Sequence, residues 1–152
     1  MKKALVIGAT GTIGSAVCSK FKTAGYETIQ SSRNSAQKID IDSIESVNDF
    51  FSHNSGFDVI ICAAGQASFG SLNKLDENDY LASFNSKLLG QIRLVKSGLS
   101  SLKQNGKILL TGGMLAYQPW PETSAIATVN AGLEGFVKAV NKELEDKKVF
   151  IV

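Results

Sequence analysis

Three glycines near the start of the chain, Gly8, Gly11 and Gly14, have a spacing that suits a backbone cradle for an anion. They follow the apolar run at residues 4–7, which is typical of a strand buried in a parallel sheet, and a helical pattern begins after them. Glycine permits a sharp turn and lets a ligand approach the backbone. The first helical turn offers unpaired N–H groups to a pyrophosphate. The stretch predicts dinucleotide binding; the alternative is a turn whose glycines serve packing alone.

The end of the second predicted strand, residues 26–30, bears on which nicotinamide cofactor is preferred. A site that selects NAD places an acid there for the ribose 2′-hydroxyl, whereas one that selects NADP has a basic group for the 2′-phosphate. This sequence continues Ser31-Ser32-Arg33, with no acid and one arginine. A guanidinium group matches a phosphate well. Ser32 and Arg33 therefore favour NADP over NAD, which stays possible because Arg33 could be an ordinary solvated loop residue.

The single histidine and the two cysteines show no pattern of a metal or nucleophilic centre. His53 ends a predicted helix among serine and asparagine residues, so we interpret it as a solvated loop histidine. Cys18 and Cys62 lie far apart and lack ligand spacing. We interpret them as buried thiols in a reducing cytoplasm, with no metal site.

Composition indicates an ordinary globular chain. Of the 152 residues, 43% are hydrophobic and 20% charged, and the net charge is +2, which implies neither a nucleic-acid partner nor a membrane surface. The apolar run near Met1 is much too short for a transmembrane helix. We find no linker, so residues 1–152 are predicted to form one domain.

Strand patterns and helix patterns alternate along the chain, which predicts an α/β fold with a doubly wound, Rossmann-like parallel sheet in three α/β/α layers. The predicted strands are residues 4–7, 26–30, 38–42, 57–62, 107–110 and 149–152, and the predicted helices are residues 13–24, 44–53, about 76–102 and about 122–142.

The glycine spacing G-x-x-G-x-x-G differs from the ordinary Rossmann signature and resembles that of the short-chain dehydrogenase/reductase family, in its less typical branches. Residues 62–65, Cys-Ala-Ala-Gly, are similar to the family's Asn-Asn-Ala-Gly motif without its asparagines. The resemblance implies that Asp40 bonds the adenine amine beside Ile41, although Asp40 could instead be a strand-end acid that caps the next helix. The implied cofactor-binding residues are Gly8, Thr10, Gly11, Thr12, Ile13, Gly14, Ser32, Arg33, Asp40, Ile41, Ala63, Ala64 and Gly65.

The catalytic positions of the family are changed in this chain. Family members transfer a hydride between a nicotinamide and a carbonyl or alcohol, assisted by a tyrosine, a lysine, a serine and an asparagine. Matching residues 131–136 to the family puts Ile126 at the tyrosine position and Asn130 at the lysine position; the usual spacing puts Gly113 at the serine position. The resemblance thus implies a degenerate catalytic set.

The family's asparagine corresponds best to Lys87, with Asn85 as an alternative two residues earlier. On an α-helix such residues are about 200° apart, so only one of them can face the cofactor. If the match is Lys87, lysine and asparagine have exchanged places, as in the similar ketoreductase domains of polyketide synthases, which keep the tyrosine. We then expect Lys87 to point towards Asn130 and Gly113, beside an apolar wall made by Ile126. The alternative is an exposed helix lysine.

Two functions remain open at this point. One is an NADP-dependent reductase of a carbonyl or alcohol substrate, whose proton donor is Lys87, Tyr117 or a water; we expect Tyr117 and Trp120 at the outer mouth of the pocket. The other is a catalytically inactive cofactor-binding sensor or partner-binding protein. The expected location is cytoplasmic, and a homo-oligomer through the long helices is possible.

The chain stops within or just after its sixth predicted strand, at Val152. Family members usually continue into a substrate-covering helix pair and a seventh strand. We therefore expect a fragment of a longer protein, with an incomplete substrate pocket and an exposed sheet edge.

Overall fold

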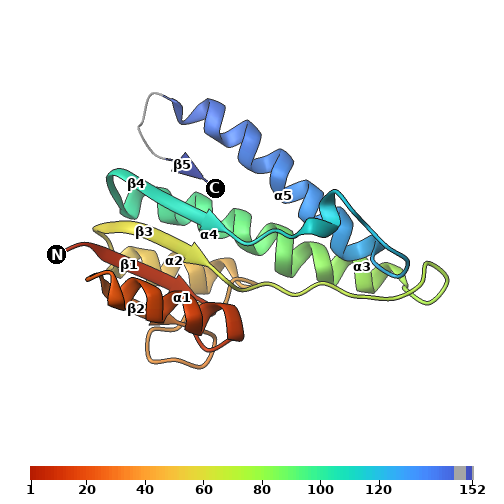
Figure 1. Ribbon diagram of the computed structural model, residues 1–152, viewed down its shortest axis with the longest axis horizontal. Coiled ribbons are helices and arrows are strands. Elements are labelled where there is room, and N and C mark those ends of the chain that lie inside the picture. The colour runs from red at the N-terminus through yellow and green to blue at the C-terminus, as the bar shows by residue number, and fades with distance from the viewer. Residues whose placement is uncertain (146–149, 152) are drawn as a thin grey trace.

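The computed structural model describes residues 1–145 and 150–151 and shows a parallel β-sheet between helices (Figure 1). Strands and helices alternate along the chain, as the sequence predicts. The elements are β1 (Lys3–Ile7), α1 (Thr12–Thr23), β2 (Glu27–Ser31), α2 (Ile44–His53), β3 (Phe57–Cys62), α3 (Glu77–Ser83), the π-helix η1 (Phe84–Leu89), α4 (Gly90–Gly98), the 3₁₀ turn η2 (Leu99–Ser101), β4 (Leu102–Leu110), the 3₁₀ turn η3 (Met114–Ala116), α5 (Ser124–Glu143) and β5 (Phe150–Ile151).

The sheet has the strand order β2-β1-β3-β4-β5, and all neighbouring pairs are parallel. From β1 the chain moves outward to β2, then returns to the other side of β1 and continues through β3 to β4. The direction of winding therefore reverses between β1 and β3. In open parallel sheets, ligands bind beyond the carboxyl ends of the strands at this point. The glycine turn after β1 and the segment after β3 both lie there.

Alternate residues of the central strands face two different cores. Leu5 and Ile7 of β1 belong to the larger apolar cluster, together with residues of α2, α4 and α5. Ala4 and Val6 face the opposite side and pack with Cys18 of α1. The period of two along a strand thus separates the two helix layers. The predicted three-layer α/β/α architecture is confirmed.

The predicted strand at residues 38–42 was wrong. This segment contributes one isolated bridge, between Ser32 and Lys38. Two of its N–H groups are used locally: Ile39 N donates to Ser32 O at 3.2 Å, and Asp40 N donates to the Ser46 hydroxyl at 2.9 Å. These hydrogen bonds replace a sheet ladder. Ile39 is nevertheless buried in the larger core, which explains its strand-like apolar pattern.

The predicted long helix at residues 76–102 is divided by the π-helix η1. A π turn closes i→i+5 hydrogen bonds, so it changes which residues face the core after it. Leu81, an apolar residue of α3 before η1, is 54% exposed. Lys87 and Gln91 are buried instead, one helical turn apart. Asn85 and Lys87 were expected to face opposite ways, but both line one cavity (described below).

Two element boundaries also differ from the prediction. β4 begins at Leu102 rather than residue 107, with an irregular register opposite the start of β3 and a positive φ of 63° at Asn105. α5 begins at Ser124, because Glu122 has a φ of 70° and cannot be helical. The last predicted strand is described only as Phe150–Ile151; the rest of it lies outside the described residues. No helix in the described ranges is both long enough and apolar enough for a membrane span.

Candidate functional site

The turn after β1 packs too closely to accept side chains at two of its glycines. Gly8 has a φ of 80°, and a Cβ there would lie 2.5 Å from the Ala63 carbonyl oxygen. A Cβ on Gly14 would clash with the backbone of Gly8 and Ala9. Glycine is required because β1, the end of β3 and the start of α1 meet at this turn. The turn thus brings its backbone, together with the Thr10 side chain, to the carboxyl end of the sheet.

The amino end of α1 has hydrogen-bond donors to spare. Its N-cap, Gly11, makes no side-chain capping bond, and the first intrahelical bond runs from Ser15 N to Gly11 O at 2.9 Å. The N–H groups of the first turn therefore have no partner inside the helix. Together with the positive end of the helix dipole, they suit an anion such as a pyrophosphate.

A cavity of about 560 Å³ lies beside this turn. Ten of the thirteen residues predicted to bind the cofactor line it, and they come from four separate stretches of the chain. Of the other three, Gly14 is buried against Gly8, and Thr12 and Ile13 are exposed on the first turn of α1. The ten are Gly8, Thr10, Gly11, Ser32, Arg33, Asp40, Ile41, Ala63, Ala64 and Gly65.

The end of β2 gives this first cavity a basic group. Arg33 is exposed, and no described carboxylate pairs with it. Asp40, on the same wall, accepts a hydrogen bond from Asp42 N at 3.1 Å through Oδ1. The cap of α2 is Ser43, whose hydroxyl accepts from Ser46 N, so Asp40 does not serve as that cap.

A second cavity, of about 640 Å³, adjoins the first. The two share the lining residues Asp42, Gly65, Gln66 and Ser86. The segment after β3 and the α3–η1 region form most of the second cavity, and α5 contributes the apolar side chain of Ile126. The two cavities are therefore neighbours with shared walls: the first lies beside the glycine turn and the second lies beside η1.

Lys87 lies at the buried side of the second cavity. It is 8% exposed, and its Nζ donates to the Thr111 carbonyl oxygen at 3.1 Å. Burial lowers the pKa of Lys87, with a weaker opposite effect from the Cys62 thiol. No carboxylate in the described ranges forms an ion pair with it. The alternative of an exposed helix lysine is excluded.

The backbone of Lys87 also explains the glycine at position 65. A Cβ on Gly65 would lie 3.0 Å from the Lys87 Cα, and Gly65 has a φ of 115°. The segment after β3 can therefore pass directly against η1. Burial raises the pKa of the nearby Cys62 thiol to about 11, so this thiol stays protonated at neutral pH.

Asn130 lies on α5 against the segment that follows β4. It is 2% exposed, and its Oδ1 has no hydrogen-bond partner among the described residues. A Cβ on Gly113 would lie 2.8 Å from the Asn130 Nδ2. Thr111, which binds Lys87, is two residues before Gly113. Lys87, Asn130 and Gly113 thus meet around the carboxyl end of β4, and one buried acceptor there is unsatisfied.

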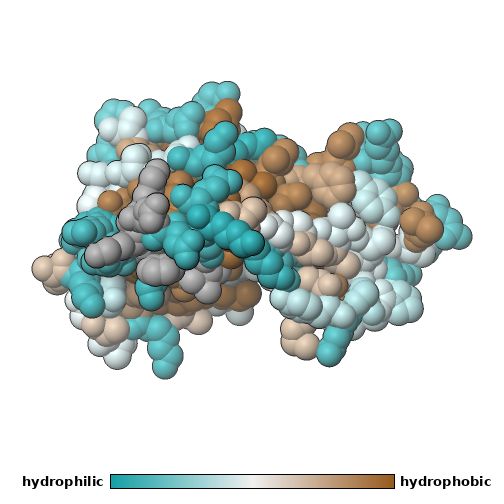
Figure 2. Space-filling model, turned by 90° about the horizontal axis from the view of Figure 1, so that it is seen from above, coloured by the Kyte–Doolittle hydropathy of each residue, from teal (hydrophilic) through white to brown (hydrophobic). Residues whose placement is uncertain are grey.

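Tyr117 lines neither cavity. Its side chain is exposed, and a hydrogen bond with Glu134 is the main cause of its raised pKa. Trp120, also predicted at the pocket mouth, is 64% exposed and does not line the cavities. Figure 2 shows hydrophobic and hydrophilic side chains mixed at the surface of this end of the molecule, beyond the carboxyl ends of the strands. The segments after β3 and β4, together with α3, carry several large exposed apolar residues: Phe69, Leu72, Leu81, Met114, Tyr117 and Trp120.

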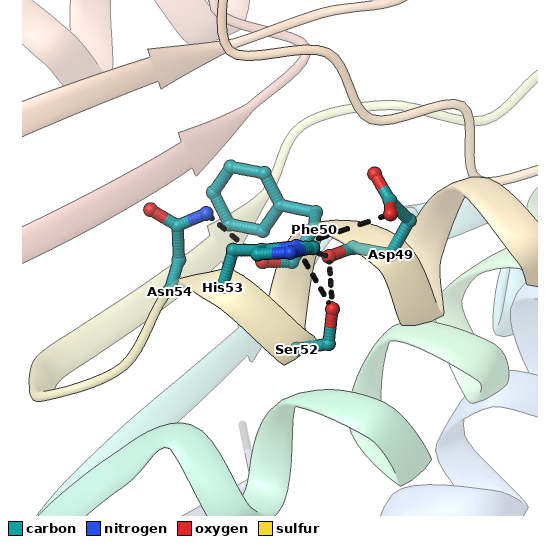
Figure 3. A network of polar contacts seen from close by, with 5 residues as sticks. All are labelled: Asp49, Phe50, Ser52, His53 and Asn54. Atoms are coloured by element: carbon teal, nitrogen blue, oxygen red, sulfur yellow. Dashed lines mark hydrogen bonds and ion pairs between the residues drawn. The ribbon is translucent and has the colours of Figure 1, made fainter.

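His53 belongs to a helix end rather than to either cavity (Figure 3). It is the last residue of α2 and not part of a loop. Its Nδ1 lies 2.9 Å from both the Ser52 hydroxyl and the Asp49 carbonyl oxygen, and Asn54 Nδ2 donates to Phe50 O at 2.9 Å. These side chains add hydrogen bonds to backbone carbonyl groups in the last turns of α2. The cluster stabilises the end of α2 and has no reactive group facing a cavity.

Sequence reasoning missed several residues of the site. Asp42, Gln66 and Ser86 line both cavities. Gln91 donates a hydrogen bond to the same Thr111 carbonyl oxygen that Lys87 binds (see the last subsection of the Results). Gln91 had a usable signal, because it follows Lys87 by four residues and shares its helix face. Gln66 and Ser86 had none, since their position depends on contacts between separate segments.

Comparisons with known proteins agree with this geometry. Residues 2–152 match the family model described as short chain dehydrogenase. The short chain dehydrogenase/reductase AacuN of Aspergillus aculeatus is 26% identical over 65% of this chain and 38% of that protein. The chain spans 38% to 66% of the length of the six curated relatives it matches.

Two solved structures are similar over nearly the whole chain. The protein lin1944 from Listeria innocua has a TM-score of 0.94 and 32% identity, covering 99% of this chain and 75% of that one. A small-chain dehydrogenase in complex with NADPH has a TM-score of 0.87 and 30% identity, covering 94% of this chain and 65% of that one.

Proposed function

The chain belongs to the short-chain dehydrogenase family, and from this premise we propose that it binds NADP(H) and transfers a hydride between the nicotinamide and a small carbonyl or alcohol substrate. The observation that carries the proposal is the first cavity. It joins the glycine turn to the basic, acid-free end of β2. The solved relative in complex with NADPH supports the same cofactor.

The donor set of the first cavity fits this cofactor. The glycine turn and the first-turn N–H groups of α1 would hold the pyrophosphate. Ser32 and Arg33 would hold the 2′-phosphate, since a guanidinium group donates two parallel hydrogen bonds to a phosphate. Asp40 would accept a hydrogen bond from the adenine amine, and Ile41 would pack against the adenine ring. The small residues after β3 would allow the ribose to approach.

The second cavity would hold the substrate. The bound nicotinamide supplies or accepts the hydride. Lys87 keeps two N–H groups beyond the one given to Thr111 O, so it can donate to the substrate oxygen or a ribose hydroxyl. The lowered pKa of Lys87 makes its ammonium a better proton donor than an exposed lysine. Ile126 would give the reacting carbon an apolar wall. Asn130, predicted to be catalytic, is buried and lines neither cavity, so we assign it no contact with the substrate.

The replacement of the family's tyrosine and serine favours a second candidate, a cofactor-binding protein without turnover. Neither Ile126 nor Gly113 can donate a proton. The two candidates share the first cavity and differ at the second. NADPH consumption with a panel of aldehydes and ketones separates them: turnover that Lys87→Met abolishes supports the enzyme, and tight NADPH binding without turnover supports the second candidate.

The cofactor proposal is tested by titrating NADPH and NADH against wild type, Arg33→Ala and Lys38→Ala. Wild type should bind NADPH more tightly, and Arg33→Ala should lose about tenfold or more for NADPH with little change for NADH, because a charge-assisted bond to phosphate is lost. Lys38→Ala removes a nearby exposed cation that does not line the cavity, and should change neither affinity. Equal wild-type affinities, or equal losses in both variants, would refute the preference for NADP.

A further inference from the structure

Gln91 of α4 is a large polar side chain buried in the apolar interior. It is 0% exposed, and the other side chains of its size that are equally buried in the described residues are all apolar. Burying an amide without partners costs free energy, so its hydrogen bonds indicate why it is there.

Both ends of the Gln91 amide bind the backbone of one residue. Its Nε2 donates to Thr111 O at 3.1 Å, and its Oε1 accepts from Thr111 N at 3.1 Å. Thr111 directly follows Leu110, the last residue of β4. The amide therefore engages both backbone groups of Thr111, and two opposed hydrogen bonds restrict the orientation of that backbone.

The same carbonyl oxygen accepts a hydrogen bond from Lys87 Nζ, with a distance of 3.1 Å between the two atoms. Gln91 follows Lys87 by four residues and shares its buried face. A carbonyl oxygen has two lone pairs, and here the two donors use them together. The direction in which Lys87 Nζ points thus depends on a carbonyl group that Gln91 orients.

The Thr111 backbone also leads into the segment beside Asn130. Gly113 follows it by two residues, and a Cβ there would lie 2.8 Å from Asn130 Nδ2. Gln91 therefore orients the start of a segment that touches both exchanged side chains, although Gln91 itself lines neither cavity.

We propose that Gln91 is a positioning residue, which holds the Thr111 carbonyl so that Lys87 Nζ points into the second cavity. The role in turnover rests on the proposed function of Lys87. The positioning itself does not, and it is measured on Lys87 directly.

The experiment follows the protonation of Lys87 in protein carrying ¹³C-labelled lysine, with the Lys87 Cε signal assigned from Lys87→Arg. Gln91→Glu keeps the side-chain size, but it replaces the Nε2 donor by a carboxylate oxygen close to the ammonium. The Lys87 titration midpoint should then rise by about one pH unit or more. Gln91→Met removes both bonds to Thr111, so Lys87 loses its oriented acceptor and its midpoint should fall. Leu94→Met, a buried control on the same helix, should leave the titration unchanged.

Unchanged Lys87 titration in folded Gln91→Glu or Gln91→Met would overturn the proposal, whether or not the protein turns over any substrate. Wild type provides a measurement that does not depend on variant folding. The Thr111 N–H should be protected from hydrogen exchange by Gln91 Oε1, and exchange as fast as in an exposed loop would overturn the proposal equally. If the Lys87 titration responds as expected but no turnover is found, the positioning stands and the enzyme proposal fails.

Discussion

The first cavity is lined by the glycine turn after β1, the small residues after β3 and the loop at residues 32–42. The second cavity is lined by the segment after β3 and the α3–η1 region, with Ile126 of α5. At the first cavity, Gly8 and Gly14 keep side chains away from the turn, and N–H groups are the exposed chemistry. At the second, Lys87 reaches 24 residues along the chain to Thr111 for its hydrogen bond. One cavity depends on the path of the chain and the other on the identity of each side chain.

Under the residue matching that we propose, this difference explains why the glycine turn keeps the family pattern while positions 113, 126 and 130 depart from it. A backbone cradle must be kept if the strand–turn–helix unit is to fold, because its glycines also allow β1, β3 and α1 to pack. We expect side chains at the second cavity to be exchangeable without loss of the fold, because they do not form the turn where β1, β3 and α1 meet. Ile126 packs as an apolar wall, and Asn130 fits beside Gly113, where a serine side chain would be crowded.

The largest effect is expected from filling the cradle. Gly14→Ala places a Cβ against the backbone of Gly8 and Ala9, neither of which can move as a flexible side chain would. The free energy of unfolding should fall by about 1–3 kcal/mol or more, and NADPH binding should be lost with it. Urea unfolding and nucleotide titration measure both.

Gly135→Ala is the matched control for this change. Gly135 lies on α5, and a Cβ there meets nothing within 4 Å. Alanine is favoured over glycine in a helix interior by about 0.5–1 kcal/mol, so this variant should be slightly more stable than wild type. Similar behaviour of the two variants would mean that the turn is not a packed cradle.

An intermediate effect, confined to the second cavity, is expected from Lys87→Met. Turnover should fall by roughly 100-fold or more because a positioned proton donor is lost, while NADPH affinity changes by less than about tenfold. Lys96→Met, an exposed change on α4, should alter neither. If Lys87→Met destroys cofactor binding and turnover equally, the separation of the two cavities into binding and chemistry is wrong.

Lys87→Met should also change how stability depends on pH. The pKa of Lys87 is lowered in the folded chain by burial, so the folded state releases its proton at a lower pH than the unfolded state. Stability in wild type should therefore rise with pH from the folded pKa up to the unfolded one, and the cost of the buried ammonium is fully present below that window. Lys87→Met should lack this rise, which denaturant unfolding at several pH values can detect.

The smallest effect is expected at the opposite end of the sheet. Lys103 Nζ donates to Asp58 Oδ2 at 2.8 Å, and this bond, with a second one from Lys3 N at 2.7 Å, lowers the pKa of the Asp58 carboxyl. Its contribution is present above the unfolded pKa of an aspartate and is lost as pH falls through the folded one. Asp58→Asn should thus be slightly less stable at neutral pH and match wild type in acid, with NADPH affinity unchanged. A loss of NADPH affinity would contradict the separation of the two sheet ends.

Much of the first cavity could be predicted from local sequence. Gly8 and Gly11 mark a turn, and Ser32-Arg33 follows a recognisable strand; each signal lies within a few residues and acts through backbone geometry. The strand prediction at residues 38–42 failed because the segment pairs with the chain beyond β2 at a single bridge, and Ile39 is buried in the larger core without a continued ladder. Apolar alternation indicates burial and does not specify the hydrogen-bond partner.

By itself the sequence determined the alternation of strands and helices and the glycine turn, because propensities and turn requirements are local. The tertiary structure alone decided that η1 is a π-helix, that Lys87 is buried, and that Gln91 and Lys87 share one carbonyl of Thr111. These depend on burial and hydrogen bonding between segments about 20 residues or more apart. The free energy of such contacts exists only once the chain has packed, so no local pattern records it.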